Sequence, residues 1–142
     1  MDQTPYEQIP AKPTMYNGRL YRSRLEARVA AYFELREWEF EYEPFDLKGW
    51  SPDFLIKSGM FNLEPGISNP VQTLVEVKPQ NDMFDIRKYI GIDFDKYELC
   101  LLTPEKMIFI SKIDIDCHEI GDSELWKEAA NKVMFLKPEY NG

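Results

Sequence analysis

The sequence predicts an α/β domain in which helices flank a central mixed β-sheet. Apolar residues recur at helical spacing in segments 23–38 and 123–134, which favours two amphipathic helices. Segment 73–78 alternates its side chains between two faces in the manner of a strand. Two further apolar runs, 97–103 and 106–112, indicate a pair of strands joined by a short turn.

Length and composition favour one domain with its own core. The chain has 142 residues, of which 44% are apolar and 14% aromatic, enough for a sizeable apolar interior. Residues 1–17 contain three prolines and few apolar side chains, so we expect an extended or flexible N-terminal arm. The single domain is then expected to span residues 18–142.

The expected elements follow from local signals along the chain. Ser23 and Glu26 match a capping box at the start of the first helix, 23–38. Ser123 is the expected N-cap of the last helix, 123–134. The remaining expected elements are strands at 40–43, 53–57, 73–78, 97–103 and 106–112, a loop at 58–70, a turn at 103–105 and a helix at 82–92.

Several classes of protein are disfavoured by what the sequence contains. The apolar runs are too short to cross a bilayer, and the first residues lack the pattern of a secretory leader. The expected compartment is therefore the cytoplasm, with no membrane partner. The two cysteines, Cys100 and Cys117, and the one histidine, His118, do not form a zinc site of any standard spacing.

The charge balance argues against a nucleic-acid-binding protein, because such proteins usually present a basic face. The formal net charge is −8. Segment 12–36, however, contains six basic residues and two acidic ones, while acidic residues cluster near the C-terminus. One local basic face on an acidic body is therefore an open interpretation, with a modest and salt-sensitive affinity for nucleic acid.

Asp53, Glu76 and Lys78 are the residues whose pattern points to chemistry. Glu76 and Lys78 lie two apart on the strand 73–78, so both side chains leave the same face, with Cα atoms about 7 Å apart. A carboxylate and an ammonium on an apolar strand are costly unless they pair or bind an ion. Asp53 opens the strand 53–57, and pairing of the two strands would bring it beside Glu76. Two carboxylates on adjacent strands suit Mg²⁺, which takes few protein carboxylates and keeps several waters.

Each of these residues also has a structural interpretation. Glu76 and Lys78 would form a buried ion pair, and Asp53 would be an ordinary turn residue after Pro52. Glu26 lies on the packed side of the first helix, where a carboxylate needs a partner. That partner would be the capping box or Arg22, four residues earlier.

Four short motifs occur in order along the chain. They are Tyr21-Arg22-Ser23-Arg24-Leu25-Glu26-Ala27-Arg28, Tyr42-Glu43-Pro44, Ser51-Pro52-Asp53-Phe54 and Leu74-Val75-Glu76-Val77-Lys78-Pro79. Together they resemble the PD-(D/E)XK nuclease superfamily, above all its compact phage-type and transposase-A-like members. The resemblance covers roughly residues 16–80 and implies a restriction-endonuclease-like core.

The resemblance implies a metal-dependent endonuclease that hydrolyses DNA phosphodiester bonds. Asp53 and Glu76 would bind Mg²⁺ together with the backbone carbonyl of Val77, and Mn²⁺ is expected to substitute. Glu26 would support a metal-bound water, and Lys78 would assist the attacking water. The residues expected to contact DNA are Arg22, Arg24, Arg28 and Gln80, and the alternative for the three arginines is a solvated helix face.

The resemblance also implies partners and leaves rivals open. The expected partner is DNA, in a bacterial or phage-infected cell. A homodimer or a higher symmetric oligomer is expected if both strands are cut, because one site cuts one strand. A non-catalytic protein with a nuclease fold, docking a basic protein through its acidic surface, is the first rival. The second is a nuclease subunit that is active only within a recombination or transposition assembly.

Overall fold

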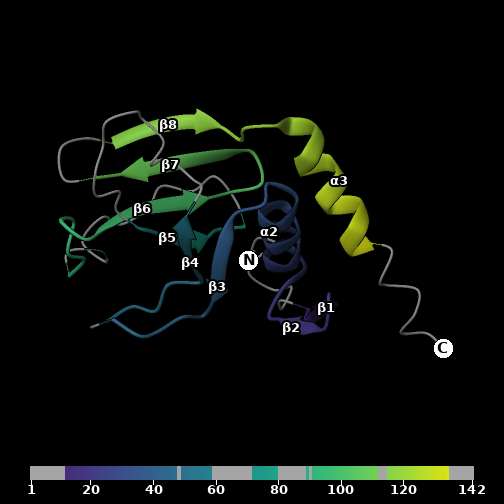
Figure 1. The fold of residues 1–142 in the computed structure, drawn as a ribbon, viewed down its shortest axis with the longest axis horizontal. Helices are drawn as coiled ribbons and strands as arrows, with labels where there is room; N and C mark the ends of the chain where they lie inside the picture. The colour runs from purple at the N-terminus through teal and green to yellow at the C-terminus, as the bar shows by residue number, and fades with distance from the viewer. Residues whose placement is uncertain are drawn as a thin grey trace, which may run out of the picture.

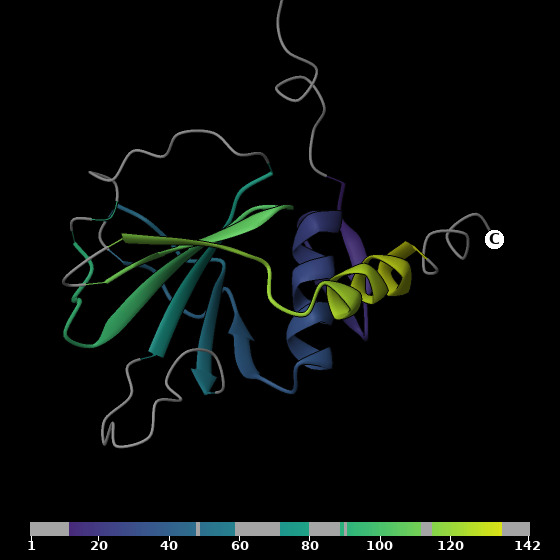
Figure 2. The same ribbon diagram turned by 90° about the horizontal axis from the view of Figure 1, so that it is seen from above.

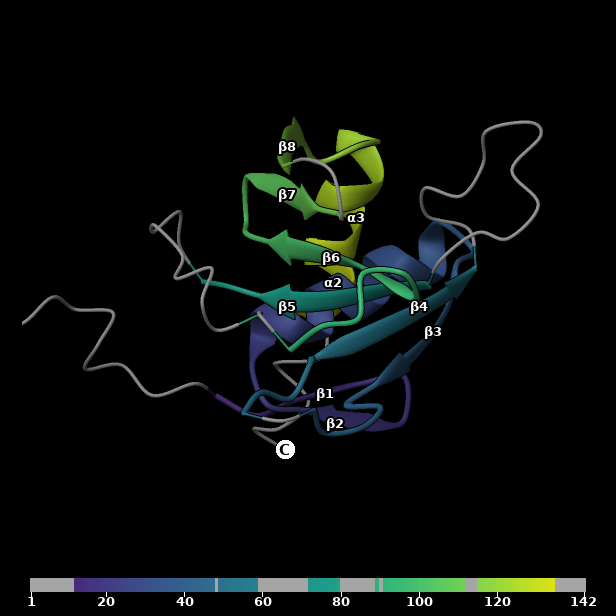
Figure 3. The same ribbon diagram turned by 90° about the vertical axis from the view of Figure 1, so that its left-hand side faces the viewer.

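The computed structural model describes residues 12–47, 49–58, 72–79, 89, 91–111 and 115–134. Its centre is a six-stranded sheet of β3 (Glu39–Tyr42), β4 (Phe54–Ser58), β5 (Gln72–Val77), β6 (Tyr97–Leu102), β7 (Lys106–Ile110) and β8 (Ile115–Glu119). The strands lie side by side in that order, as Figures 1 and 3 show. The β5–β6 pair is parallel and the other four pairs are antiparallel. The sheet is therefore mixed, as predicted.

Two helices, α2 (Arg24–Leu35) and α3 (Ser123–Met134), pack against each other on one side of this sheet (Figure 2). Of the apolar positions of α2 that recur at helical spacing, Val29, Tyr32 and Phe33 are fully buried there, and Leu25 is partly buried. They meet Phe54 of β4, Val75 of β5 and Trp126 of α3 in one continuous core. These contacts confirm the predicted α/β class. None of the described helices is long and apolar enough to span a membrane.

A second, smaller core covers the opposite face of the sheet. Leu74 of β5 and Leu99 of β6 point to this side, where Trp50 and Tyr89 pack edge to face with ring centroids 5.0 Å apart. Leu74 and Val75 thus face opposite sides, as strand alternation requires. The second core matters for the site because it fixes the face from which Glu76 projects.

A two-stranded hairpin precedes α2 and differs from the expected arm. β1 (Thr14–Tyr16) pairs antiparallel with β2 (Arg19–Tyr21). The turn between them is Asn17-Gly18, and both residues have positive φ, 50° and 81°. That geometry is typical of the tight hairpin turn which Asn-Gly favours. Ordered structure therefore reaches into the segment 1–17, and the residues before 12 lie outside the described part of the chain.

Other boundaries also differ from the expected ones. β8 was not expected, because all five of its residues are exposed and no apolar alternation marks it as a strand. β7 ends at Ile110 and not at residue 112. The turn at 103–105 is confirmed, with the Thr103 N–H donating to the Lys106 carbonyl at 2.9 Å. The expected helix 82–92 and loop 58–70 lie mostly outside the described residues.

The two described helices begin with side-chain caps. Ser23 Oγ accepts a hydrogen bond from the Glu26 N–H at 3.0 Å, which is the expected N-cap contact of α2. In α3 the cap is Asp122 and not the expected Ser123, because the Asp122 carboxylate accepts from the Leu125 N–H at 3.2 Å. Asp122 also has a positive φ of 54°, which aspartate tolerates better than most residues.

Ser23→Ala is expected to lower the free energy of unfolding by about 1 kcal/mol, because the substitution removes the only side-chain acceptor seen for the Glu26 N–H among the described residues. Urea denaturation followed by far-UV circular dichroism measures the change. Ser23→Thr is the matched control, since it keeps a hydroxyl acceptor and should be nearly neutral. Equal losses in the two variants would show that the hydroxyl does not act as a cap.

Candidate active site

The pairing of β4 with β5 brings Asp53 to the middle of the Glu-X-Lys segment. Phe54 pairs with Val75, and the Asp53 N–H donates to the Val75 carbonyl at 2.9 Å. β4 begins at Phe54, so the Val77 N–H lies beyond the ladder. In place of a strand carbonyl, Oδ2 of the Asp53 carboxylate accepts a hydrogen bond from the Val77 N–H at 2.8 Å. The expected proximity of the two strands is therefore confirmed.

The Val77 carbonyl lies on the same side of β5 as Asp53. The Lys78 N–H points the other way, toward β6, where it donates to the Leu102 carbonyl at 2.8 Å. Along a strand, successive residues direct their backbone groups to alternate sides. The N–H and C=O of Val77 therefore both face the edge where Asp53 lies.

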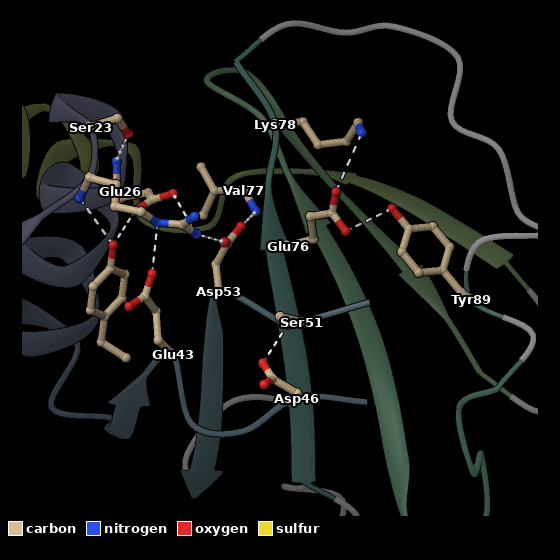
Figure 4. A network of polar contacts seen from close by, with 12 residues as sticks. Ser23, Glu26, Glu43, Asp46, Ser51, Asp53, Glu76, Val77, Lys78 and Tyr89 are labelled. Carbon is tan, nitrogen blue, oxygen red and sulfur yellow. Dashed lines mark hydrogen bonds and ion pairs between the residues drawn. The ribbon is translucent and has the colours of Figure 1, made fainter. Parts of the chain in front are cut away.

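Glu76 leaves β5 on the face of the second core. Its side chain is buried, and Oε1 accepts a hydrogen bond from the Tyr89 hydroxyl at 3.0 Å. Lys78 Nζ lies 3.6 Å from Glu76 Oε2, with the lysine side chain 24% exposed. Figure 4 shows the carboxylate directed toward both partners. The structure thus contains the Glu76–Lys78 ion pair that the structural interpretation expected.

Glu26 approaches Asp53 from α2. Its backbone N–H is capped by Ser23, while its carboxylate accepts a short hydrogen bond from the Tyr42 hydroxyl. Glu26 Oε2 also lies 3.8 Å from Arg22 Nη2. Arg22, the first partner proposed for the carboxylate, is present, and of the capping box the Ser23 side-chain contact is present. The contact with Tyr42 comes in addition and joins α2 to β3.

Arg22 occupies the space between these acidic side chains. Its guanidinium lies 2.9 Å from Asp53 Oδ1 and 2.7 Å from Glu43 Oε2. The Arg22 side chain is 63% exposed, whereas that of Asp53 is 11% exposed. Arg22 therefore covers the solvent side of the Asp53 carboxylate. A hollow of about 360 Å³, lined in part by Arg22, Glu43 and Pro52, opens beside it.

The other expected DNA contacts have different positions. The Arg28 guanidinium stacks 3.6 Å from the ring centroid of Trp126 and donates twice to the Trp126 carbonyl. This contact ties α2 to α3 and leaves Arg28 half-buried. Arg24 is exposed at the first residue of α2. Gln80 lies outside the described residues.

Electrostatics single out Asp53. Burial raises the pKa of its carboxyl to about 6, and the negative charges of Glu26 and Glu76 act in the same direction. The Val77 N–H and the Arg22 guanidinium oppose the rise without cancelling it. A carboxyl that is buried beside two other carboxylates is costly to ionise, and a positive ion relieves that cost. Such a raised pKa in a group of acidic residues is a common feature of functional sites.

The donor atoms fit a hard divalent cation. They are carboxylate and carbonyl oxygens, which suit Mg²⁺ and Mn²⁺ better than softer metals. Among the described residues, no group of three or more His, Cys, Asp or Glu side chains is arranged to hold a metal ion. Mg²⁺ takes only one or two protein carboxylates. Asp53 and Glu76, with the Val77 carbonyl, are the residues that would hold it.

Sequence reasoning missed three residues that shape the site. Tyr89 and Tyr42 donate their hydroxyls to Glu76 and Glu26, and no local pattern reveals hydrogen bonds that depend on tertiary packing. Glu43 pairs with Arg22 from a strained backbone, with a φ of 49°. Its position just before Pro44 gives no signal for this, because a residue before proline favours an extended backbone, which Glu43 does not adopt.

Comparisons with family models, with curated proteins and with solved structures find no match to this chain.

Proposed function

We propose that the chain is a metal-dependent deoxyribonuclease with a restriction-endonuclease-like core. The observation that carries the proposal is the contact between the Asp53 carboxylate and the N–H of Val77, the residue between Glu76 and Lys78. Asp53 is thereby held at the end of the strand that carries Glu76, whose carboxylate pairs with Lys78. The raised pKa of Asp53 supports the presence of a cation there.

In this proposal Asp53 and Glu76 bind Mg²⁺ with the Val77 carbonyl, and Glu26 orients a water next to it. Bound Mg²⁺ supplies a Lewis acid that polarises a phosphodiester and makes water a better nucleophile. Tyr89 holds the Glu76 carboxylate in place, and Tyr42 does the same for Glu26. Lys78 follows β5 with its ammonium 3.6 Å from Glu76, and it would bring positive charge to the phosphate as its negative charge grows.

DNA is the proposed substrate, because the catalytic pattern resembles that of DNA-cleaving enzymes. Of the three arginines expected to contact DNA, Arg24, exposed at the start of α2, could contact a backbone phosphate without losing a contact within the described residues. Cutting of both strands would call for a homodimer or a larger symmetric oligomer.

The overall charge favours a second candidate, a non-catalytic nuclease-like protein that binds a basic partner. The chain carries a net charge of −8. Two of the arginines expected to contact DNA, Arg22 and Arg28, are engaged within the protein. A third candidate, a nuclease subunit active only in a larger assembly, shares the metal site with the first. Metal binding therefore separates the second candidate from the other two.

A cleavage assay tests the proposal directly. The purified chain is incubated with single-stranded, duplex, flapped and four-way-junction DNA in the presence of Mg²⁺, Mn²⁺ or EDTA. We expect cutting with either metal, none with EDTA, and a fall to background in Asp53→Asn and Glu76→Gln, which remove one ligand charge each. Glu119→Gln is the matched control, because that residue is exposed on β8.

A protein that cuts none of these substrates with either metal is not a free-standing nuclease. Titration calorimetry with Mn²⁺ then separates the remaining candidates. Binding of the ion that is lost in Asp53→Asn indicates a subunit awaiting its assembly. Absence of binding indicates a protein that has kept the fold without the chemistry.

A further inference from the structure

The acidic site already contains a cation, the Arg22 guanidinium. Its three acidic neighbours are Glu43 at 2.7 Å, Asp53 at 2.9 Å and Glu26 at 3.8 Å. They approach from three directions, since Glu26 lies on α2, Glu43 follows β3 and Asp53 precedes β4 (Figure 4). One positive charge is thus shared among three carboxylates.

The guanidinium binds one of the two oxygens of the Asp53 carboxylate. Oδ2 of that carboxylate is engaged by the Val77 N–H, and Oδ1 by Arg22 Nη2. A divalent cation bound to Asp53 from the solvent side would lie within a few ångströms of the guanidinium. Two positive groups at that separation repel each other even in a watery environment. The two cations therefore compete for one carboxylate.

The surroundings of Arg22 allow its side chain to leave while its backbone stays in place. The side chain is 63% exposed, so turning it outward uncovers little of the core. The backbone is held by the Arg22 N–H, which donates to the Tyr42 hydroxyl at 3.0 Å, and by the buried ring of Tyr21 before it. The neighbouring hollow of about 360 Å³ gives the guanidinium room to move.

We propose that Arg22 is the resident counter-ion of this site and that a divalent cation binding at Asp53 displaces it. The inference rests on the proposed function, because it requires a cation at Asp53. The arginine-rich sequence around Arg22 did not indicate this role. Arg22 stabilises the metal-free fold and, by the same contact, weakens metal binding.

The role predicts opposite effects on two measurements. In Arg22→Gln, the affinity for Mn²⁺ alone, measured by titration calorimetry, should rise roughly tenfold or more, because a competing positive charge is gone. In EDTA, the same variant should melt at a lower temperature than the wild type, since three carboxylates lose their counter-ion. A residue that only contacts phosphate would change neither quantity.

Two further variants serve as controls. Arg19→Gln removes the same charge from an exposed position on β2, outside the acidic group, and should leave Mn²⁺ affinity within about twofold of the wild type. Arg22→Lys keeps a positive charge and should also bind Mn²⁺ with nearly wild-type affinity. If Arg22→Gln does not fold without metal, addition of Mn²⁺ should restore the fold, and that rescue supports the role.

The outcomes separate this inference from the proposed function. Mn²⁺ binding that is detectable only in Arg22→Gln supports competition. Equal or weaker binding in Arg22→Gln than in Arg19→Gln overturns the inference, and the proposed function then survives if the wild type still cuts DNA with metal. Absence of Mn²⁺ binding in every variant overturns both.

Discussion

Lys78→Met should reduce the rate of metal-dependent DNA cleavage by about 10²–10³-fold, the range found when a preorganised charge is removed from a reacting centre. Methionine keeps most of the length and apolar stem of lysine but has no positive end. The Lys78 side chain is 24% exposed and lies beside Glu76, so its charge faces the site and not bulk solvent. Single-turnover cleavage at saturating enzyme measures the change without interference from product release.

The lysine should matter for chemistry and much less for metal binding. We expect Lys78→Met to bind Mn²⁺ within a few-fold of the wild type, whereas Asp53→Asn should lose the ion. Lys57→Met is the matched control, because Lys57 lies on β4 and pairs with Glu41 away from the site. A Lys78→Met protein that cuts DNA at the wild-type rate would leave the lysine only its ion pair with Glu76.

The strands of the site were predictable because their signals are local. The alternation in 73–78 and the apolar run after Asp53 both reflect strand geometry, and two neighbouring strands bring Asp53 to Val77 once they pair. The helix that carries Glu26 was equally predictable, since its apolar stripe and its capping serine lie within a few residues of each other.

The partners of the acidic residues were not predictable, because they depend on distant packing. Tyr89 lies 13 residues from Glu76, and Tyr42 lies 16 residues from Glu26. Hydrogen bonds of this kind form only when the sheet and helix have assembled. The strand β8 was not predicted for another reason, since its five exposed residues carry no apolar pattern. The first hairpin, in contrast, has a local signal in Asn17-Gly18, a dipeptide typical of tight hairpin turns.

The role of Arg22 lies between these cases. Its spacing to Glu26 was visible in the sequence and correctly indicated an ion pair. Its closer contacts, with Glu43 and Asp53, come from two other segments and could be known only from the fold. A basic residue in a candidate nuclease is readily interpreted as a phosphate contact. The side chain of Arg22 instead contacts the protein's own carboxylates.

Asp53→Asn should make the metal-free protein more stable at pH 7.5 by about 1–2 kcal/mol. The pKa of Asp53 is about 6 in the folded protein and 3.8 in the reference state. A difference of that size corresponds to roughly 3 kcal/mol at most, since one pKa unit is worth 1.36 kcal/mol. Loss of the charge-assisted bond to Arg22 offsets part of the gain.

The sign follows from proton linkage. The folded protein binds a proton at Asp53 more tightly than the unfolded chain does, so this carboxyl stabilises the fold below about pH 4. That contribution is lost as pH rises from about 4 to about 6, and it stays lost above. The amide that replaces the carboxyl in Asp53→Asn cannot ionise, so the variant should lack this part of the pH dependence.

Urea denaturation between pH 4 and pH 8 in EDTA measures both effects. Asp116→Asn is the control, because Asp116 is an exposed carboxylate on β8. If Asp53→Asn is less stable than the wild type at pH 7.5 and keeps its pH slope, then the charge of Asp53 favours folding through Arg22 and Val77. Added Mg²⁺ should reverse the order of stabilities, because a ligand that binds only the folded wild type stabilises it by mass action. The metal-free fold would then be less stable because it buries an acid. Binding of the ion to that acid would restore the stability.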